Sequence, residues 1–372
     1  PSPRNLFVLI GHGGPDGATM WGQVAPLGPE EMQWLHARGR GDDVLVSGNC
    51  YGGVLARTVN CGFFGARPDV VATGCQADAL EVAESKDYLH VFFEAFTSAK
   101  RALADTDVPV AHMHVLCEDE SVIGRAFYLM EFVQGQVFWE QSLPGMSTQQ
   151  RRAHYVELNR VLSRLHLAPY AQIGLQDYGK PGNYIERQIA RWSKQYQASI
   201  TQPIEAMDRL IEWLPQHMPA SAQRELTSIV HGDYRIDNVI YHPERAEILA
   251  VLDWELSTLG HPLADFSYHC MAWHIPPGTF RGLGGVDLAA LGIPLEDEYI
   301  RMYCDQTGLA DPVDLKTDWN FYLAYNMFRI AAILQGIAKR VENGTASSAQ
   351  ARASGAGARP MAELAWQFAQ RA

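Results

Sequence analysis

The chain has 372 residues, of which 47% are hydrophobic, and its 30 basic and 42 acidic side chains give a formal charge of −12. The length suffices for two or three domains with buried cores, and the negative charge disfavours a general nucleic-acid-binding role because phosphate backbones attract basic surfaces. No apolar run approaches the roughly 20 residues that span a bilayer and the first residues carry no signal pattern, so we expect a cytoplasmic protein without a membrane partner.

The first third of the chain combines short apolar runs with helix-like stretches, as is typical of an α/β fold. β-branched runs that end in glycine predict buried parallel strands at 5–14, 42–53 and 68–76. Stretches with helical periodicity occur at 29–40 and 84–103. We therefore expect residues 1–107 to form an α/β fragment with a short, mostly parallel sheet.

The predicted secondary structure changes near Val108. Residues 111–119 and 124–135 predict two antiparallel strands around a turn, after which helices dominate. Two of these helices carry one apolar face each, formed by Tyr155, Leu158, Leu162 and Leu165 and by Ile330, Leu334, Ile337 and Val341. The small, polar segment 342–360 predicts a flexible loop before a last helix at 361–371.

The stretch HGDYRIDN, residues 231–238, has the spacing of a phosphoryl-transfer catalytic loop. Four residues separate Asp233 from Asn238, which would set a carboxylate against the acceptor hydroxyl and an amide on a metal ion. Asp253 ends an apolar run 15 residues later, and oxygen ligands of this kind suit Mg²⁺. The intervening residues predict a hairpin that brings Asn238 and Asp253 together.

Several neighbouring residues admit more than one role. His231 is expected to support the loop, whereas Asp265 suits loop orientation, a helix cap or a buried ion pair. Arg235 suits either a contact with phosphate or an ion pair with a surface acid. Three tryptophans are expected in the core or in a pocket wall, namely Trp254, Trp273 and Trp319.

Residues 108–372 resemble the superfamily of aminoglycoside phosphotransferases and choline kinases, in particular the kinase-like domain fused to some acyl-CoA dehydrogenases. The resemblance is carried by five motifs, at 127–139, 176–192, 229–242, 251–278 and 325–340. It implies a protein-kinase-like α+β fold with hinge strands at 112–133 and a mostly helical C-lobe at 140–372.

The same resemblance implies that the protein uses ATP and Mg²⁺. Asp233 would be the catalytic carboxylate and Asn238 and Asp253 the metal ligands, and the adenine would lie against the hinge residues Met130, Glu131 and Val133. The acceptor would be a hydroxyl of a small molecule, such as a hydroxy acid or a hydroxyacyl-CoA. The sequence leaves the oligomeric state open.

The small lobe that such a fold requires is incomplete or replaced in this sequence. No lysine occurs between Pro1 and Lys86, and Phe96 occupies the position of the usual helix glutamate. The basic residues that could replace the phosphate-binding lysine are Arg57, Arg67 and Lys100. Without that charge the phosphates lose a strong contact, so turnover is in question.

Residues 1–107 resemble a fragment of a caspase- or legumain-type cysteine peptidase. His12 and Cys50 each follow a predicted strand, and parallel strands deliver such side chains to one sheet edge, where a thiolate can attack a carbonyl. Two alternatives to the phosphotransferase follow. The chain is either a cysteine peptidase that uses this dyad or a catalytically inactive fusion of two partial domains.

Overall fold

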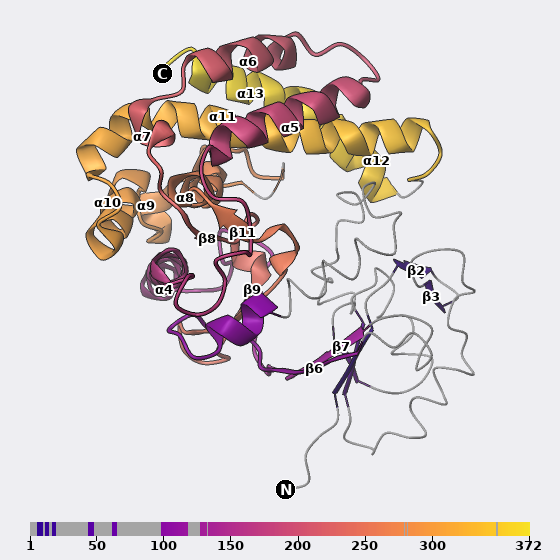
Figure 1. Ribbon diagram of the computed structural model, residues 1–372, viewed down its shortest axis with the longest axis vertical. Helices are drawn as coiled ribbons and strands as arrows, with labels where there is room; N and C mark the ends of the chain where they lie inside the picture. The colour runs from indigo at the N-terminus through magenta and orange to yellow at the C-terminus, as the bar shows by residue number, and fades with distance from the viewer. Residues whose placement is uncertain are drawn as a thin grey trace, which may run out of the picture. The chain divides into compact units, whose positions relative to one another are not determined.

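The computed structural model describes five short strands before residue 65 and then residues 98–117, 127–131, 133–278, 280, 282–346 and 349–372 (Figure 1). The chain divides into two compact units, which are described separately. The first combines Pro1–Val137 with Asp237–Glu255, and the second combines Phe138–Ile236 with Leu256–Ala372. Within the described residues, no helix has the length and apolar character needed to cross a bilayer.

The first unit contains a parallel sheet. Its strands β1 (Leu6–Leu9), β4 (Val44–Ser47) and β5 (Gly62–Phe64) pair in the order β1-β4-β5, and both pairings are parallel, as the sequence predicts for its first two strands. The short strands β2 (His12–Gly14) and β3 (Gly17–Thr19) form an antiparallel pair. The strand predicted at 68–76 lies outside the described residues.

Two further antiparallel pairs lie in the first unit. The predicted pair near residues 111–135 is confirmed as β6 (Met113–Cys117) and β7 (Phe127–Met130). Strands β9 (Val239–Tyr241) and β10 (Ile248–Val251) form the other pair. Backbone bonds tie them to the chain before residue 138, because Gln136 and Tyr241 exchange two bonds of 2.8 Å and Val251 N donates to Pro109 O at 2.9 Å.

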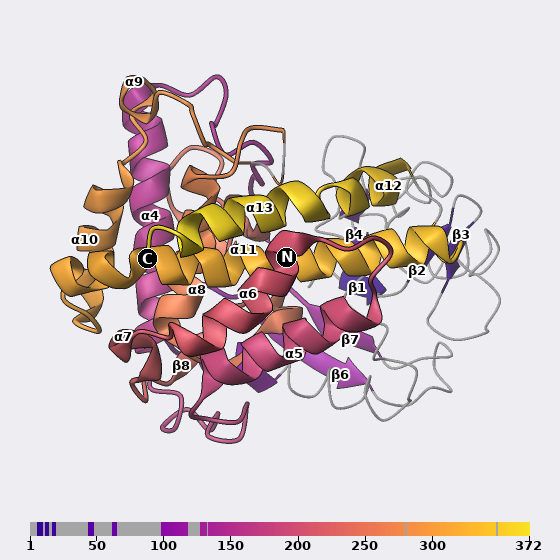
Figure 2. The ribbon, with the colours of Figure 1, turned by 90° about the horizontal axis from the view of Figure 1, so that it is seen from above.

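The second unit is mostly helical. Its main helices are α4 (Thr148–Leu167), α5 (Tyr184–Ala198), α6 (Glu205–Gln216), α8 (Pro262–Cys270), α10 (Glu296–Thr307), α11 (Pro312–Glu342) and α13 (Ala358–Ala369). Helices α5 and α13 lie along α11, and α6 lies against α13, in both ribbon views (Figures 1 and 2). Among the shorter elements are α7 (Ala220–Gln223), β8 (Ser228–Val230), β11 (Thr258–Gly260) and α9 (Leu288–Leu291).

Local sequence explains where the two longest helices begin. Ser147 accepts from Gln150 N at 3.2 Å while the Gln150 side chain accepts from Ser147 N at 2.9 Å, which is a capping box for α4. Asp311 caps α11 through Val313 N at 2.8 Å, and Pro312 supplies a preset φ at the first helical position.

The predicted core faces are confirmed apart from one position. All four apolar residues of the α4 face are fully buried, and of the α11 face Ile330, Leu334 and Ile337 are buried, whereas Val341 is partly exposed. The three tryptophans are core residues, with exposed fractions of 5% or less. Trp254 also donates its indole N–H to Val251 O at 2.8 Å, so its polar atom is satisfied.

The loop predicted at 342–360 is wrong over much of its length. Residues Ala349–Ala356 form helix α12, and α13 begins at Ala358. Alanine has the highest helix propensity, and a position without a side chain lets two helices approach closely. A Cβ atom added to Gly355 would lie 2.9 Å from Ala338 Cα, so the small residues that suggested a loop permit close packing of α12 on α11.

We predict that Gly355→Leu lowers the free energy of unfolding by about 1–3 kcal/mol, because the new side chain overpacks the contact between α12 and α11. The matched control is Ala356→Leu, which adds a leucine at the next, exposed position of the same helix. Urea denaturation followed by circular dichroism compares the two. Equal midpoints for the two variants would show that α12 is not packed as described.

Candidate functional site

The loop that carries Asp233 follows strand β8 in the second unit. Strand β8 pairs antiparallel with β11, and the Ser257 hydroxyl donates to Val230 O at 2.8 Å where the loop begins. Gly232 has φ +84°, and a Cβ atom there would lie 2.7 Å from Leu256 O. Glycine is therefore required in the HGD sequence, both for its conformation and for the close approach of the backbone.

Asp265 on α8 holds this loop. Its carboxylate accepts from His231 N at 2.7 Å, from Gly232 N at 2.8 Å and from His166 Nε2 at 3.1 Å. His166 Nδ1 in turn lies 2.7 Å from the Tyr303 hydroxyl. Of the roles considered for Asp265, the structure supports loop orientation and a buried pair with His166, while the helix cap position belongs to His261. We call these contacts the Asp265 clamp.

The clamp also determines the charge of the carboxyl group. Burial alone would raise the pKa of Asp265, but the hydrogen bond from His166, the charges of His166 and His231 and the backbone bond from His231 together hold it below its ordinary value. Asp265 is only 4% exposed. It remains an anion in the core because hydrogen-bond donors surround it.

The Asp233 carboxylate lies among groups of the second unit that donate or carry positive charge. Tyr268 donates its hydroxyl to Asp233 Oδ1 at 2.5 Å, and Arg235 Nε lies 3.2 Å from the same oxygen. The backbone N–H of Asp233 donates to His231 Nδ1 at 3.2 Å, which agrees with a supporting role for His231. Arg235 thus pairs with Asp233 itself, which neither of its predicted roles described.

A second arginine supports the same loop. Arg329, on α11 and 6% exposed, donates to Gly232 O at 2.8 Å, and its guanidinium carbon lies 5.1 Å from the centre of the Tyr268 ring. Burial, followed by the charge of Asp233, raises the pKa of Tyr268 well above its ordinary value, so Tyr268 keeps its proton and acts as a donor. Sequence reasoning missed Tyr268 and Arg329, because they lie 35 and 97 residues from the loop residues that they bond.

In the first unit, the hairpin predicted between Asn238 and Asp253 is confirmed. Strands β9 and β10 pair so that Val239 lies opposite Val251, and Leu252 N donates to Asn238 O at 2.8 Å. The two residues thus stand at the open end of one hairpin. Asp253 has φ +59°, a conformation uncommon outside glycine that occurs often at functional turns.

An amide oxygen and a carboxylate at adjoining positions fit Mg²⁺. This ion is commonly held by one or two protein oxygens together with water and substrate phosphates, so a dedicated cage is not required. No group of three or more His, Cys, Asp or Glu side chains converges in the described part of the chain. The assignment of Asn238 and Asp253 as metal ligands stays a prediction.

The predicted hinge residues follow strand β7. Glu131 N donates to His112 O at 2.7 Å, a backbone bond that extends the pairing of β6 and β7 by one residue. The Glu131 carboxylate also accepts from His112 N at 3.3 Å. Met130 and Val133 are half-buried and Glu131 is exposed. The role of all three residues in adenine binding stays a prediction.

Of the three basic residues that could replace the phosphate-binding lysine, Lys100 is the one whose position the structure describes. Arg57 and Arg67 lie outside the described residues, whereas Lys100 belongs to a helical stretch at 98–103 and is 2% exposed. Burial lowers the pKa of Lys100 to about 8, while the charge of Asp253 in the same unit acts in the opposite direction. Lys100 Nζ lies 3.9 Å from Met130 Sδ.

The alternative peptidase dyad stays a prediction. His12 is the first residue of β2, for which the structure describes the backbone, and Cys50 lies outside the described residues.

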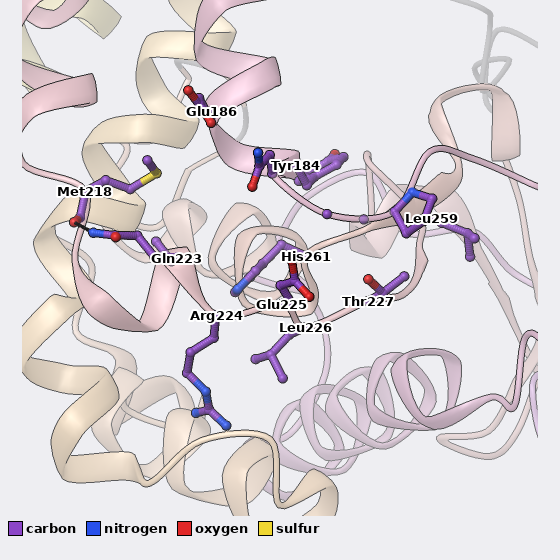
Figure 3. A pocket seen from close by; sticks show the side chains of 15 residues that line it. Tyr184, Glu186, Met218, Gln223, Arg224, Glu225, Leu226, Thr227, Leu259 and His261 are labelled. Carbon is purple, nitrogen blue, oxygen red and sulfur yellow. Dashed lines mark hydrogen bonds between the residues drawn. The ribbon is translucent and has the colours of Figure 1, made fainter.

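The second unit also contains a pocket of about 190 Å³ (Figure 3). It is lined by residues of the segments 181–186, 218–227 and 259–261, among them Tyr184, Glu186 and His261. Thr227 and Gly260 stand at the end of the β8–β11 ribbon opposite to the loop of Asp233, since Ser228 pairs with Gly260 and Val230 with Thr258. Sequence reasoning gave no sign of this pocket.

Comparison with known proteins identifies the relatives of the chain. A family model described as "Phosphotransferase enzyme family" matches residues 80–310. The chain is 50% identical over 271 residues to acyl-CoA dehydrogenase family member 10 of Mus musculus and 40% identical over 275 residues to family member 11 of the same species. These alignments cover 72% and 73% of the chain but 25% and 34% of the relatives, so the chain spans about a quarter to a third of their length.

Solved structures agree with this result. The crystal structure of a candidate aminoglycoside phosphotransferase from Ralstonia eutropha JMP134 is 61% identical, with a TM-score of 0.71, and the match covers 75% of this chain and 83% of that one. The GDP and kanamycin complex of APH(2")-IIIa is 15% identical with a TM-score of 0.50, covers 73% and 83% of the two chains, and shows the fold alone. The predicted kinase-like phosphotransferase fold is thus confirmed.

We predict that Asp265→Asn lowers the free energy of unfolding by about 3 kcal/mol at pH 7, because a neutral amide replaces an anion that accepts three hydrogen bonds. The folded pKa of Asp265 lies below its unfolded value, so this contribution is complete above about pH 4 and fades as the pH falls through the folded pKa. Urea unfolding between pH 3 and pH 7 measures it.

The control for this prediction is Asp305→Asn, which removes an exposed carboxylate from α10. Its effect should stay within about 0.5 kcal/mol. A difference between wild type and Asp265→Asn that grows toward pH 3 would contradict the clamp.

Proposed function

Because the chain belongs to the phosphotransferase enzyme family, we propose that it transfers the terminal phosphoryl group of ATP to a hydroxyl of a small molecule. The observation that carries the proposal is the position of Asp233, which the Asp265 clamp and the Tyr268 hydroxyl hold in one orientation. Phosphoryl transfer depends on positioning and on electrostatic stabilisation more than on covalent participation of the protein, and the clamp supplies that positioning.

In the proposed reaction, Asp233 orients the acceptor hydroxyl and accepts its proton. The hydroxyl oxygen forms a bond to the terminal phosphorus as the bond between that phosphorus and the bridging oxygen of ADP breaks. Tyr268, through a hydrogen bond, and Arg235, through an ion pair, keep this carboxylate aligned.

The nucleotide would bind through residues of the first unit. The adenine would lie against Met130, Glu131 and Val133, and Asn238 and Asp253 would hold Mg²⁺. When bound, the ion neutralises charge that develops on the phosphate oxygens. The name of the APH(2")-IIIa complex includes GDP, which supports nucleotide use at the level of the fold.

We propose an anionic acceptor, such as a hydroxy acid or a hydroxyacyl-CoA. Two guanidinium groups, those of Arg235 and Arg329, contact the loop that presents Asp233. Like charges repel, so this surrounding favours a carboxylate or phosphate over a polycationic aminoglycoside. The names of the two mouse relatives, which refer to acyl-CoA dehydrogenases, point to the same chemical class.

The chain can also act as a nucleotide-binding protein without turnover. The observation that favours this second candidate is the lack of any lysine before Lys86, the region from which a kinase-like small lobe normally provides its phosphate contact. We propose that this lobe is replaced by the segment before residue 108.

We predict that Asp233→Asn reduces phosphoryl transfer by about 10²–10⁴-fold while ATP affinity changes little, because the variant loses the proton acceptor and keeps the nucleotide contacts. ADP release is measured with Mg-ATP and a panel of short hydroxy acids, their CoA esters and kanamycin. Asp305→Asn serves as the matched control, since it removes an exposed carboxylate. Undiminished transfer by Asp233→Asn would exclude the assigned role, and ATP binding without any product would favour the second candidate.

A further inference from the structure

We propose that the pocket of the second unit, lined by the segments 181–186, 218–227 and 259–261, binds a small, uncharged polyhydroxy compound. This site is separate from the loop of Asp233, because Ser228 and Gly260 pair at the opposite end of the β8–β11 ribbon. It therefore does not depend on the proposed phosphoryl transfer. Its first segment belongs to the motif at 176–192, to which the proposed function assigns no role.

A buried imidazole lies in the wall of this pocket. His261 is 3% exposed, and its Nε2 atom lies 3.1 Å from Ser221 O. A carbonyl oxygen only accepts, so Nε2 carries the proton. Burial lowers the pKa of His261 to about 4, so the ring is neutral near pH 7 and Nδ1 keeps a lone pair.

The Nδ1 atom of His261 points to a ligand that donates a hydrogen bond. It is buried and has no hydrogen-bond partner among the described residues. Buried acceptors without a partner are costly and therefore rare in native proteins. Figure 3 shows the ring below Tyr184 near the centre of the pocket, where a bound hydroxyl group would supply the donor.

The start of helix α5 adds donors to the same pocket. Asn183 precedes the helix with φ +47°, and its side chain makes no hydrogen bond to the first turn. The first N–H groups of a helix have no acceptor within the helix, so those of Tyr184 and Glu186 are available to a ligand. The Tyr184 ring packs closely on Gly260, where an added Cβ atom would lie 2.8 Å from Tyr184 Cε2.

The charged groups of the lining do not favour an ion. The carboxylates of Glu186 and Glu225 belong to exposed residues, where water screens their charge. Arg224 is also exposed, donates to Leu309 O at 3.4 Å and extends away from His261 in Figure 3. The neutral imidazole forms no ion pair. The inner part of the pocket therefore offers hydrogen bonds and no strong charge.

A polyhydroxy compound matches this set of groups. A hydroxyl group donates and accepts through one oxygen atom, so neighbouring hydroxyls can donate to His261 Nδ1 and accept from the start of α5. The volume of about 190 Å³ lies below the roughly 300 Å³ at which ligand pockets usually begin, so the ligand is small. The apolar side chains of Leu226 and Leu259 can contact its carbon atoms.

NMR spectroscopy can follow His261 directly. Long-range ¹H–¹⁵N spectra of the full chain, recorded without nucleotide, report the tautomer of each imidazole, and His261→Phe identifies the signals of His261. Glucose, myo-inositol and glycerol are the probes, with choline as a cationic and acetate as an anionic comparison. We expect the Nε2–H tautomer in the free protein. At least one polyol should move the Nδ1 signal saturably in the direction of a hydrogen-bonded nitrogen.

Two variants with the same substitution locate the binding. Thr227→Phe places a ring in the pocket and should weaken polyol binding about 10-fold or more, as the loss of hydrogen bonds implies. Thr317→Phe, at an exposed position of α11, should leave the affinity unchanged. If thermal denaturation shows that Thr227→Phe is not folded, Thr227→Leu takes its place, and His261→Gln likewise replaces His261→Phe.

Each other outcome overturns the proposal. A proton on Nδ1 in the free protein would remove the acceptor, and unchanged signals with all three polyols would exclude the ligand class. A response to choline or acetate alone would indicate a site for an ion. Equal affinities of wild type and Thr227→Phe would place the binding outside the pocket. None of these results bears on the proposed function, because no nucleotide is present.

Discussion

The buried carboxylate of Asp265 is the constraint on which the rest of the candidate site depends. It accepts hydrogen bonds from the two backbone amides that precede Asp233 and from His166, and so joins α8 and α4 to the loop after β8. An anion in this position is tolerated because three donors surround it, and removal of one donor would leave the buried charge with less compensation. These bonds hold the loop in the conformation described above.

Other long-range contacts act on the same loop. Arg329 reaches Gly232 from the middle of α11, and Tyr268 reaches Asp233 from the turn of α8 that follows Asp265. Gly232 admits this crowding because it has no side chain. The long helix α11 thus contributes both to the core, through its apolar face, and to the candidate site, through one buried cation.

The segment at 342–360 shows how a local reading of the sequence fails. Alanine, glycine and serine give no amphipathic period, so the segment was predicted as a loop. In the structure the same residues form α12 and the start of α13, where close packing on α11 favours the helical state. Tertiary contact stabilised a helix that neither periodicity nor capping had indicated.

The sequence by itself determined the parts of the site that lie close together along the chain. Three features follow from local patterns, since turn residues and the alternation of apolar side chains act over a few residues. They are the spacing of Asp233 and Asn238, the hairpin between Asn238 and Asp253, and the two strands that precede the hinge. The family also followed from motifs in the sequence.

Only the tertiary structure decided which residues surround these parts. Tyr268, Arg329 and the paired state of Arg235 depend on how distant helices pack, and the burial of Lys100 depends on its environment and not on its position in a motif. Side-chain burial and charge are set by contacts between segments far apart in sequence. The residue pattern within one segment does not show which distant segments it contacts.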